Sequence, residues 1–374
     1  MKTTTLSKRN YFGCGAFLAV VLLSTGLAAE ANPRRKVIID QDALGPGGSN
    51  MQALVLALQS HDVDVLGITI TSGDGWCGEN VAHTLRLLEL IGRSDVPVVP
   101  GAIFPLVNSK EETLRWEKIH GNLFYKGAWM EVYRETPNVK RGPGHGPYEI
   151  PPLEEGEPRT RPLAESAASF IIRKVREFPG EVTLLQLGPA TNFALAARLD
   201  PQFAALVKEL VIMGGSFSPK PADNSFALEY LYTPRLEFNF RWDPEATRIV
   251  LRSPWPKVTL VPIDPTTKTL FTAELIARCT QADTPVARYI KRYAQGFPLW
   301  DELAVAVWLE PKLVTREEVI TVDADIDHGA GYGNTLSWPP GHGPGLGERD
   351  ANVVFDIDLP AFESLCARLF NQAP

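Results

Sequence analysis

The chain has 374 residues, 44% of them hydrophobic and 22% charged, and a formal net charge of −7. These proportions are ordinary for a soluble globular protein that buries a large core. The negative charge argues against a main role in gripping nucleic acid, because phosphate binding favours a basic surface. The length exceeds one average domain, but single α/β domains reach this size.

The first residues differ from the rest of the chain. They comprise a basic stretch with Lys2, Lys8 and Arg9, an apolar run at 15–23, and small residues at 26–29. This order is typical of a secretory signal, and the run is short for a membrane span, which needs roughly 20 residues. We therefore predict a signal segment at residues 1–31 and export to the periplasm or the medium, with an uncleaved anchor as the alternative. Cys14 precedes the apolar run, whereas a lipid-modified cysteine would follow it.

Beyond this segment the chain holds Cys77, Cys279 and Cys366. Their wide spacing matches neither a disulfide framework nor a zinc site. One bridge is conceivable in an oxidising compartment, but we expect three buried thiols. The fold must then depend on its hydrophobic core.

From residue 36 onward, apolar strand-like runs alternate with segments of helical spacing. The predicted strands are 36–40, 63–70, 96–99, 182–187, 210–213 and 258–261, which closes the series. The predicted helices are 51–59, 79–91, 163–178, 192–198 and one opened by Asp243-Pro244-Glu245 with Asp243 as its cap. Ser49 or Asn50 is the expected N-cap of the first helix. Apolar strands separated by amphipathic helices predict an α/β fold: an open, mostly parallel, Rossmann-like sheet with helices on both faces.

Two long polar stretches interrupt this rhythm, at residues 137–162 and 329–349. Loops of this length without periodicity are either functional flaps or mobile decoration. No internal repeat and no linker is evident, so we expect one domain at residues 32–374.

Ligands of parallel sheets bind beyond the carboxyl ends of the strands. Reading the expected strand ends in chain order gives these candidate site positions: Asp40, Asp42, Asp74, Thr191, Met213, Glu237, Asn239, Trp300 and Asp301. Their carboxylates, amide and backbone carbonyls are hard oxygen ligands, which suit Ca²⁺ because this ion takes 6–8 of them. A bound Ca²⁺ would orient a diol and lower the pKa of a water molecule.

Several of these candidates also have a plain structural interpretation. Asp40 and Asp42 could simply cap the sheet edge and the following helix. Met213 and Trp300 could belong to the core, and Trp300 could instead form a stacking wall. We expect His120, a lone histidine outside these positions, to have no catalytic role.

Five motifs occur in an order that resembles the inosine-uridine-preferring nucleoside hydrolases. They are Asp40-Gln-Asp42, the segment LGPATNFALAARLDP at 187–201, Val211-Ile-Met-Gly-Gly215, Glu237-Phe-Asn239 and Asp243-Pro-Glu-Ala246. The similarity extends from about Lys36 to the segment 352–358. It implies an enzyme that cleaves the N-glycosidic bond of ribonucleosides with a Ca²⁺-bound water, releasing ribose and free base. It also implies a homodimer or homotetramer.

The resemblance assigns the metal and sugar contacts to matched positions. Asp42, the main-chain carbonyl of Thr191 and Asp301 would contribute to the Ca²⁺ site, with Asp40 beside it. The ribosyl group would contact a further set of positions: Met213 beneath the sugar, Glu237 and Asn239 at the ribose 5′ end, Asp301 at the hydroxyls, and Asp74 in place of an asparagine of the family.

Three catalytic positions depart from the family pattern. Ser49 and Asn50 align with paired aspartates, of which the first is the general base and the second a calcium ligand. General-base assistance is worth roughly 10²–10⁴ in rate, so Asp42 or Asp74 would have to replace it. Trp300 stands where the family has histidine; it cannot protonate a departing base but can stack on one.

Three hypotheses follow. The first is an exported Ca²⁺-dependent nucleoside hydrolase in which Asp42, Asn50 and Trp300 occupy the catalytic positions. The second is a nucleoside- or sugar-binding protein that has lost turnover, which the Ser49-Asn50 pair favours. In the third, the remodelled loop Gly45-Pro-Gly-Gly48 serves a different glycosidic substrate.

Overall fold

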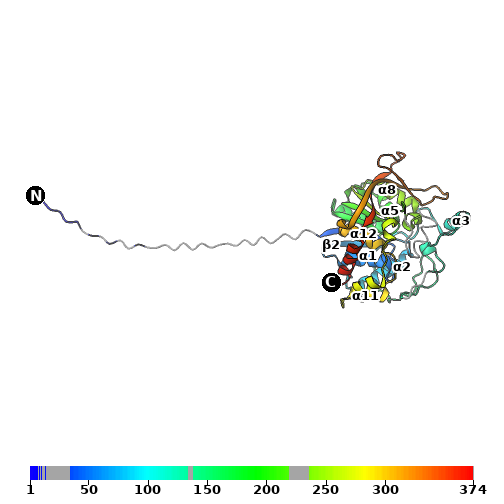
Figure 1. The fold of residues 1–374 in the computed structure, drawn as a ribbon, viewed down its shortest axis with the longest axis horizontal. Helices are drawn as coiled ribbons and strands as arrows, with labels where there is room; N and C mark the ends of the chain where they lie inside the picture. Colours follow the sequence, from blue (N-terminus) through cyan, green and yellow to red (C-terminus); the bar gives the residue numbers. More distant parts are fainter. Residues whose placement is uncertain are drawn as a thin grey trace. The chain divides into compact units, whose positions relative to one another are not determined.

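The computed structural model describes residues 34–133, 138–218 and 236–373, with a few positions before residue 14. Residues 34–374 form one compact unit (Figure 1), separate from residues 1–33. The signal segment at 1–31 falls mostly outside the described residues and stays a prediction. Within the part of the chain that is described, no helix is both long and apolar enough to cross a membrane.

Nine strands in the described residues form one sheet. They are β1 (Arg35–Gln41), β2 (Val63–Ile70), β3 (Val98–Pro100), β4 (Val182–Gln186), β5 (Glu209–Met213), β6 (Val258–Val261), β7 (Val314–Ala324), β8 (Thr335–Trp338) and β9 (Arg349–Ile357). Their order is β3-β2-β1-β4-β5-β6-β9-β7-β8. Neighbours from β3 to β9 run parallel, and β7 is antiparallel to both of its neighbours. The mostly parallel α/β sheet is therefore as predicted.

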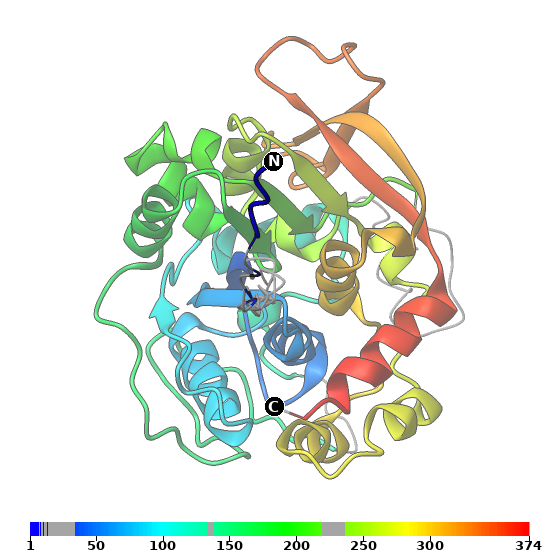
Figure 2. The ribbon, with the colours of Figure 1, turned by 90° about the vertical axis from the view of Figure 1, so that its left-hand side faces the viewer.

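Helices cover both faces of this sheet. They are α1 (Gly48–Gln59), α2 (Cys77–Leu90), α3 (Lys110–His120), α4 (Ala167–Glu177), α5 (Thr191–Leu199), α7 (Phe238–Trp242), α8 (Pro244–Leu251), α9 (Ile263–Thr266), α10 (Ala273–Cys279), α11 (Pro285–Tyr293), α12 (Trp300–Leu309) and α13 (Leu359–Phe370). In Figure 2 the green helices α4 and α5 lie on one side of the sheet, and the red helix α13 lies on the other.

The core is divided by the sheet because successive residues of a strand point to opposite faces. In β1, Ile38 packs with Phe170 of α4 and Phe193 of α5. Its neighbour Ile39 packs with Leu54 of α1. Both faces are buried, which explains why these strands are apolar throughout instead of alternating.

The first helix begins differently from the prediction. Gly47 is the N-cap of α1, with no side-chain cap, and Ser49 and Asn50 lie inside the first turn. Gly47 has φ 68°, and a Cβ there would come within 2.0 Å of the Tyr293 carbonyl oxygen. Only glycine suits the backbone conformation at position 47. Because the helix begins directly after Gly47, Ser49 and Asn50 lie past the N-cap position. The hydroxyl and the amide face other partners instead.

Two candidate segments, 237–239 and 300–301, lie at helix N-termini and not at strand ends as we expected. Glu237 is the N-cap of α7, and Trp300 opens α12. The sheet also continues beyond residue 261, and β8 lies within the predicted loop 329–349. In contrast, Asp243 caps α8 as predicted, accepting a hydrogen bond from the Ala246 backbone N–H at 3.0 Å.

The cysteines behave as expected. Cys77, Cys279 and Cys366 are all free and buried. Burial raises the pKa of the Cys77 thiol to about 11. These thiols are therefore core residues without a disulfide among them.

Candidate active site

A cavity of about 370 Å³ opens at the carboxyl ends of β1, β4 and β5. The chain leaves β1 toward β2 on one side, while β4 and β5 follow on the other, so the cavity lies at a topological switch point. Its lining includes most of the predicted site residues: Asp42, Asn50, Asp74, Met213, Glu237, Asn239, Trp300 and Asp301. Its volume falls in the range of small-molecule sites.

Asp42 forms the floor of the cavity at the end of β1. Its carboxylate accepts hydrogen bonds from the Asn50 side-chain amide at 3.1 Å and from the Asp74 backbone N–H at 2.7 Å. Asp42 is 1% exposed. Burial, together with the charges of Asp74 and Asp301, raises the pKa of Asp42 well above its ordinary value. The floor is therefore a place where negative charge is costly unless a ligand or a donor neutralises it.

Gln41 is a site-forming residue that the sequence analysis missed. Its Oε1 accepts from the Asp42 backbone N–H at 2.9 Å, and its Nε2 donates to Asp301 Oδ2 at 2.9 Å. Gln41 is completely buried. The available signal was an amide at the end of a buried strand, where a polar group requires a partner.

Glu302 is a second missed residue. It is completely buried behind Ser49, whose hydroxyl donates to Glu302 Oε2 through a short hydrogen bond. The same hydroxyl accepts from the Asp301 backbone N–H at 2.9 Å. Burial raises the pKa of Glu302 well above its ordinary value. A carboxylate following Asp301 in the otherwise apolar helix α12 was the signal.

Glu237 and Asn239 form the cavity wall next to the carboxyl end of β5. Glu237 accepts from the backbone N–H groups of Asn239, Phe240 and Gly215 at 2.9–3.1 Å, and burial raises its pKa to about 7. Asn239 Nδ2 donates to the carbonyls of Leu187 and Met213 at 3.0 and 3.1 Å. Its Oδ1 is buried without a hydrogen-bond partner in the described structure. An unpaired acceptor in a cavity wall is suited to a ligand hydroxyl.

Aromatic side chains form the rim of the cavity. They are Phe124, Tyr125, Tyr133, Phe238, Phe297 and Trp300. Trp300 lies 6.4 Å from Phe297 between ring centroids and also packs against the core, while its role as a stacking wall for a ligand stays a prediction. Arg141 is the one basic side chain in this lining, as far as the structure is described. Flat apolar faces beside one cation suit a planar heterocycle with polar edges.

Asp74 lies between the floor and the rim. Burial raises its pKa, although hydrogen bonds from the side chains of Tyr125 and Asn50 and the charge of Arg141 oppose that effect. The Asp74 carboxyl group is thus hydrogen-bonded both to Asn50 at the floor and to Tyr125 at the rim. It is placed to contact a group that spans them.

Two predicted metal positions, Asp40 and Thr191, do not line the cavity. Asp40 Oδ1 accepts from Thr69 and from the Asn192 side-chain amide, and burial raises its pKa to about 7. The Thr191 hydroxyl donates to Asp243 Oδ2 at 2.8 Å. Both side chains therefore support the sheet edge and the helices around it, and metal binding by the main-chain carbonyl of Thr191 stays a prediction.

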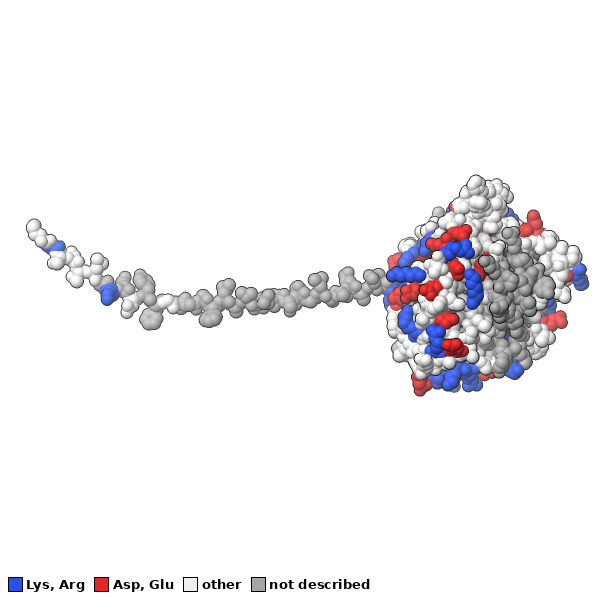
Figure 3. Space-filling view, viewed as in Figure 1, with Lys and Arg blue, Asp and Glu red and all other residues white. Residues whose placement is uncertain are grey.

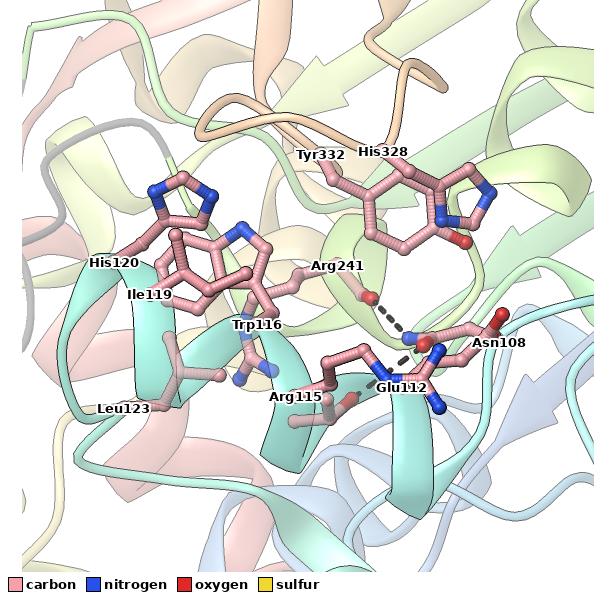
Figure 4. A pocket seen from close by; sticks show the side chains of 11 residues that line it. Asn108, Glu112, Arg115, Trp116, Ile119, His120, Leu123, Arg241, His328 and Tyr332 are labelled. Atoms are coloured by element: carbon pink, nitrogen blue, oxygen red, sulfur yellow. Dashed lines mark hydrogen bonds between the residues drawn. The ribbon is translucent and has the colours of Figure 1, made fainter.

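A smaller cavity of about 150 Å³ lies between α3 and residues 328–332 (Figure 4). His120 lines this smaller cavity and contacts Trp116, with 5.1 Å between ring centroids. Arg241 lies between the two cavities: it lines the smaller one and donates from Nη2 to the Tyr125 carbonyl at 2.7 Å. His120 does not line the larger cavity.

The loop at 138–165 is attached to α2 by a buried ionic network. Glu79 and His83 of α2 meet His145 and Glu155 of the loop, with His83 Nδ1 hydrogen-bonded to Glu155 and His145 Nε2 at 3.1 Å from Glu79. Burial lowers the pKa of His83, but its contacts with Glu155 and Glu79 outweigh that effect and raise it overall. Burial alone would raise the pKa of Glu79, but the contacts of Glu79 with His145 and His83 outweigh that effect and lower its pKa to about 2. This network holds the loop that supplies Arg141.

Replacing His83 by glutamine is expected to lower the free energy of unfolding by about 1–3 kcal/mol near pH 6, since hydrogen bonds to charged groups contribute that much. A raised histidine pKa gives stability below the unfolded value of about 6.5, and that stability is lost as pH rises through the folded value. The lowered pKa of Glu79 gives stability above 4.5 that is lost as pH falls toward about 2. Urea unfolding at about pH 6 and pH 9 should show a smaller defect at the higher pH. An unchanged defect would mean that the network is not ionic.

Side chains of both charges are mixed on the face seen in Figure 3. Lys and Arg side chains lie there among Asp and Glu side chains. Pairs such as Arg173–Glu165 and Arg176–Asp200 neutralise each other at 2.7 and 2.6 Å.

The cavity residues do not form an evident calcium site. Among the described residues, no group of three or more His, Cys, Asp or Glu side chains is arranged to hold a metal ion. Both oxygens of Asp42 and one oxygen of Asp301 already accept hydrogen bonds from N–H groups. Ca²⁺ takes 6–8 oxygen ligands. Here the groups next to the carboxylates are N–H donors, which cannot ligate a cation.

Comparison with known proteins identifies the family. The chain is 28% identical to the pyrimidine-specific ribonucleoside hydrolase RihA of Shewanella woodyi, over 89% of this chain and 97% of that protein. It is 31% identical to RihA of Citrobacter koseri, over 75% and 81%. A solved plant nucleoside hydrolase, PpNRh1, matches with a TM-score of 0.67 and 25% identity, covering 91% of this chain and all of that one. The family model for inosine-uridine preferring nucleoside hydrolase matches residues 37–364, so the chain belongs to that family.

Proposed function

We propose that this protein hydrolyses the N-glycosidic bond of ribonucleosides to ribose and free base. The observation that carries the proposal is the layering of the cavity. Acceptors at its floor and wall, Asp42, Asp301 and Asn239, face the place for a sugar, and aromatic side chains above them face the place for a base. The names of several relatives include pyrimidine or uridine, so pyrimidine ribonucleosides are the first substrates to test.

The floor would hold the sugar through its hydroxyl groups. Carboxylates of Asp42 and Asp301 accept from ribose hydroxyls, and Asn239 Oδ1 accepts one more. As the bond from the anomeric carbon to the base nitrogen breaks, positive charge develops on the ribosyl group. Fixed negative groups in a buried site stabilise that charge more than water would.

The nucleophile is a water molecule on the floor side of the sugar. Its oxygen bonds to the anomeric carbon, and its proton passes to a carboxylate, for which Asp42 and Asp74 are the candidates. The base leaves with the bonding electrons toward the rim, where Trp300 stacks on it and Arg141 stabilises its negative charge until solvent protonates it.

The family is known for a metal-dependent mechanism, and the calcium ion expected from the resemblance would activate that water. Asp42 and Asp301 are the two cavity carboxylates that would hold it. N–H donors already reach both oxygens of Asp42 and one oxygen of Asp301, each of which keeps a second lone pair for a hydroxyl. No step of the proposed mechanism passes through a metal.

Release of ribose from a panel of purine and pyrimidine ribonucleosides tests the proposal directly. We expect release from at least one pyrimidine ribonucleoside, with equilibrium binding measured alongside on the same preparation. Binding without release would instead support the second candidate, a ribosyl-binding protein, which the replacement of a family aspartate by Ser49 favours. Neither binding nor release would contradict both.

We also propose export through residues 1–31, and assembly as a homodimer or homotetramer. The first rests on the order of basic, apolar and small residues in that segment. The second rests on the family resemblance. Detection of the protein in the periplasm or medium, and its mass in solution, test these two proposals separately.

A further inference from the structure

We propose that this cavity binds its ribosyl ligand without a metal ion, because the side-chain amides of Gln41 and Asn50 fill the place of a cation between Asp42 and Asp301. The inference rests on the site of the proposed function and concerns how that site is neutralised. Four hydrogen bonds carry it, three between side chains and one from the Asp42 backbone N–H.

The orientation of both amides follows from one backbone group. The Asp42 N–H can only donate, so the Gln41 atom 2.9 Å away is the carbonyl oxygen Oε1. The other end of the Gln41 amide is then Nε2, and it donates to Asp301 Oδ2 at 2.9 Å. Gln41 thus presents an N–H donor to Asp301. A metal ion at that place would require an oxygen ligand there instead.

The same reasoning fixes Asn50. One atom of its amide lies 3.2 Å from Gln41 Oε1 and 3.1 Å from Asp42 Oδ1. Both neighbours are acceptors, so this atom must be the donor Nδ2. Asn50 therefore presents N–H groups, and no ligand oxygen, to the carboxylate at the centre of the floor.

The remaining oxygens are too few for calcium. Asp42 Oδ2 accepts from the Asp74 backbone N–H at 2.7 Å, which leaves neither Asp42 oxygen without a donor. Asp40 and Thr191, the other expected ligands, do not line the cavity. A Ca²⁺ ion requires 6–8 oxygens at 2.3–2.6 Å, and it would have to displace these donors to obtain them.

Calcium binding by the purified protein tests this inference without reference to turnover. We expect titration calorimetry to detect no binding at millimolar Ca²⁺ and the Tm to stay unchanged. Nucleoside affinity should be the same in Ca²⁺ as in a chelator. Replacing Asn50 by aspartate supplies the missing charge and oxygens, so we expect Ca²⁺ to raise the Tm of that variant by about 5 °C.

Asn192→Asp is the matched control. Asn192 is also buried and also donates its Nδ2 to an aspartate, Asp40 Oδ1 at 2.8 Å, but it does not line the cavity. Its variant should lose stability without responding to Ca²⁺. If Asn50→Asp does not fold without calcium, refolding with and without the ion gives the same information.

Two results would overturn the inference. One is stoichiometric calcium binding by the unaltered protein, and the other is an Asn50→Asp variant no more responsive to Ca²⁺ than Asn192→Asp. Failure of the proposed function has a different signature, namely absence of nucleoside binding and ribose release whatever the calcium measurements show.

Discussion

Replacing Asp301 by asparagine is expected to weaken ribonucleoside binding and ribose release by about 10²–10⁴-fold. Asn keeps the shape of Asp301 and can still accept from Gln41 Nε2, the present partner of Oδ2. The other end of the side chain then becomes a donor and can no longer accept from the sugar. Two hydrogen bonds to a charged acceptor contribute about 3–6 kcal/mol together, and each 1.4 kcal/mol is tenfold in affinity.

Asp264→Asn serves as the control for loss of a buried aspartate. Asp264 accepts from the backbone N–H groups of Phe217 and Ser218 at 3.0 and 2.7 Å, is 7% exposed, and does not line the cavity. Its variant should lose stability while nucleoside affinity stays as in the unaltered protein. Equal nucleoside affinity in Asp301→Asn and the unaltered protein would remove Asp301 from the site.

The fold was largely predictable because its strands carry a strong local signal. Residues 63–70 and 258–261 are rich in β-branched and aliphatic residues, and they form β2 and β6 with those bounds. The strands after residue 261 were missed for a physical reason. In β7 the first half is charged and exposed, so its sequence lacks the buried pattern on which the prediction relied.

The candidate site was predictable where it follows directly from the sheet. Asp42 and Met213 lie at the ends of β1 and β5, and parallel strands place such residues along one edge. Glu237 and Trp300 reach the same cavity from helix N-termini. Both had been expected at strand ends, because helix starts far along the chain give no local indication of their neighbours.

The residues missed by the sequence analysis act through long-range pairs. Gln41 bonds to Asp301, which is 260 positions away, and Ser49 bonds to Glu302, 253 positions away. No spacing rule connects such positions in a single sequence. The replacement of a family aspartate by Ser49 could therefore be recognised, but the contact of Ser49 with Glu302 could not be foreseen.

Restoring the family aspartate by Ser49→Asp alone is expected to lower the free energy of unfolding by about 2–4 kcal/mol. Ser49 now donates to Glu302 and accepts from the Asp301 backbone N–H. An aspartate there would place two carboxyl groups in contact at a buried position, where both cannot ionise. Because one proton must be shared, the loss of stability should be larger at about pH 8 than at about pH 5. Urea unfolding at the two pH values measures it.

Adding Glu302→Gln to Ser49→Asp should recover much of that stability, because the glutamine amide can donate to the new carboxylate. The double-mutant cycle should therefore give a favourable coupling of about 1–3 kcal/mol, with Glu302→Gln alone as the control. Because Ser49 stands at the position of the family's general base, the double variant should also release ribose about 10–10²-fold faster than the unaltered protein, a partial recovery of the 10²–10⁴ that general-base assistance provides. If the stability changes of the two single variants simply add in the double variant, Ser49 and Glu302 are not energetically coupled. A stable and active Ser49→Asp single variant would show that the buried glutamate does not constrain this position.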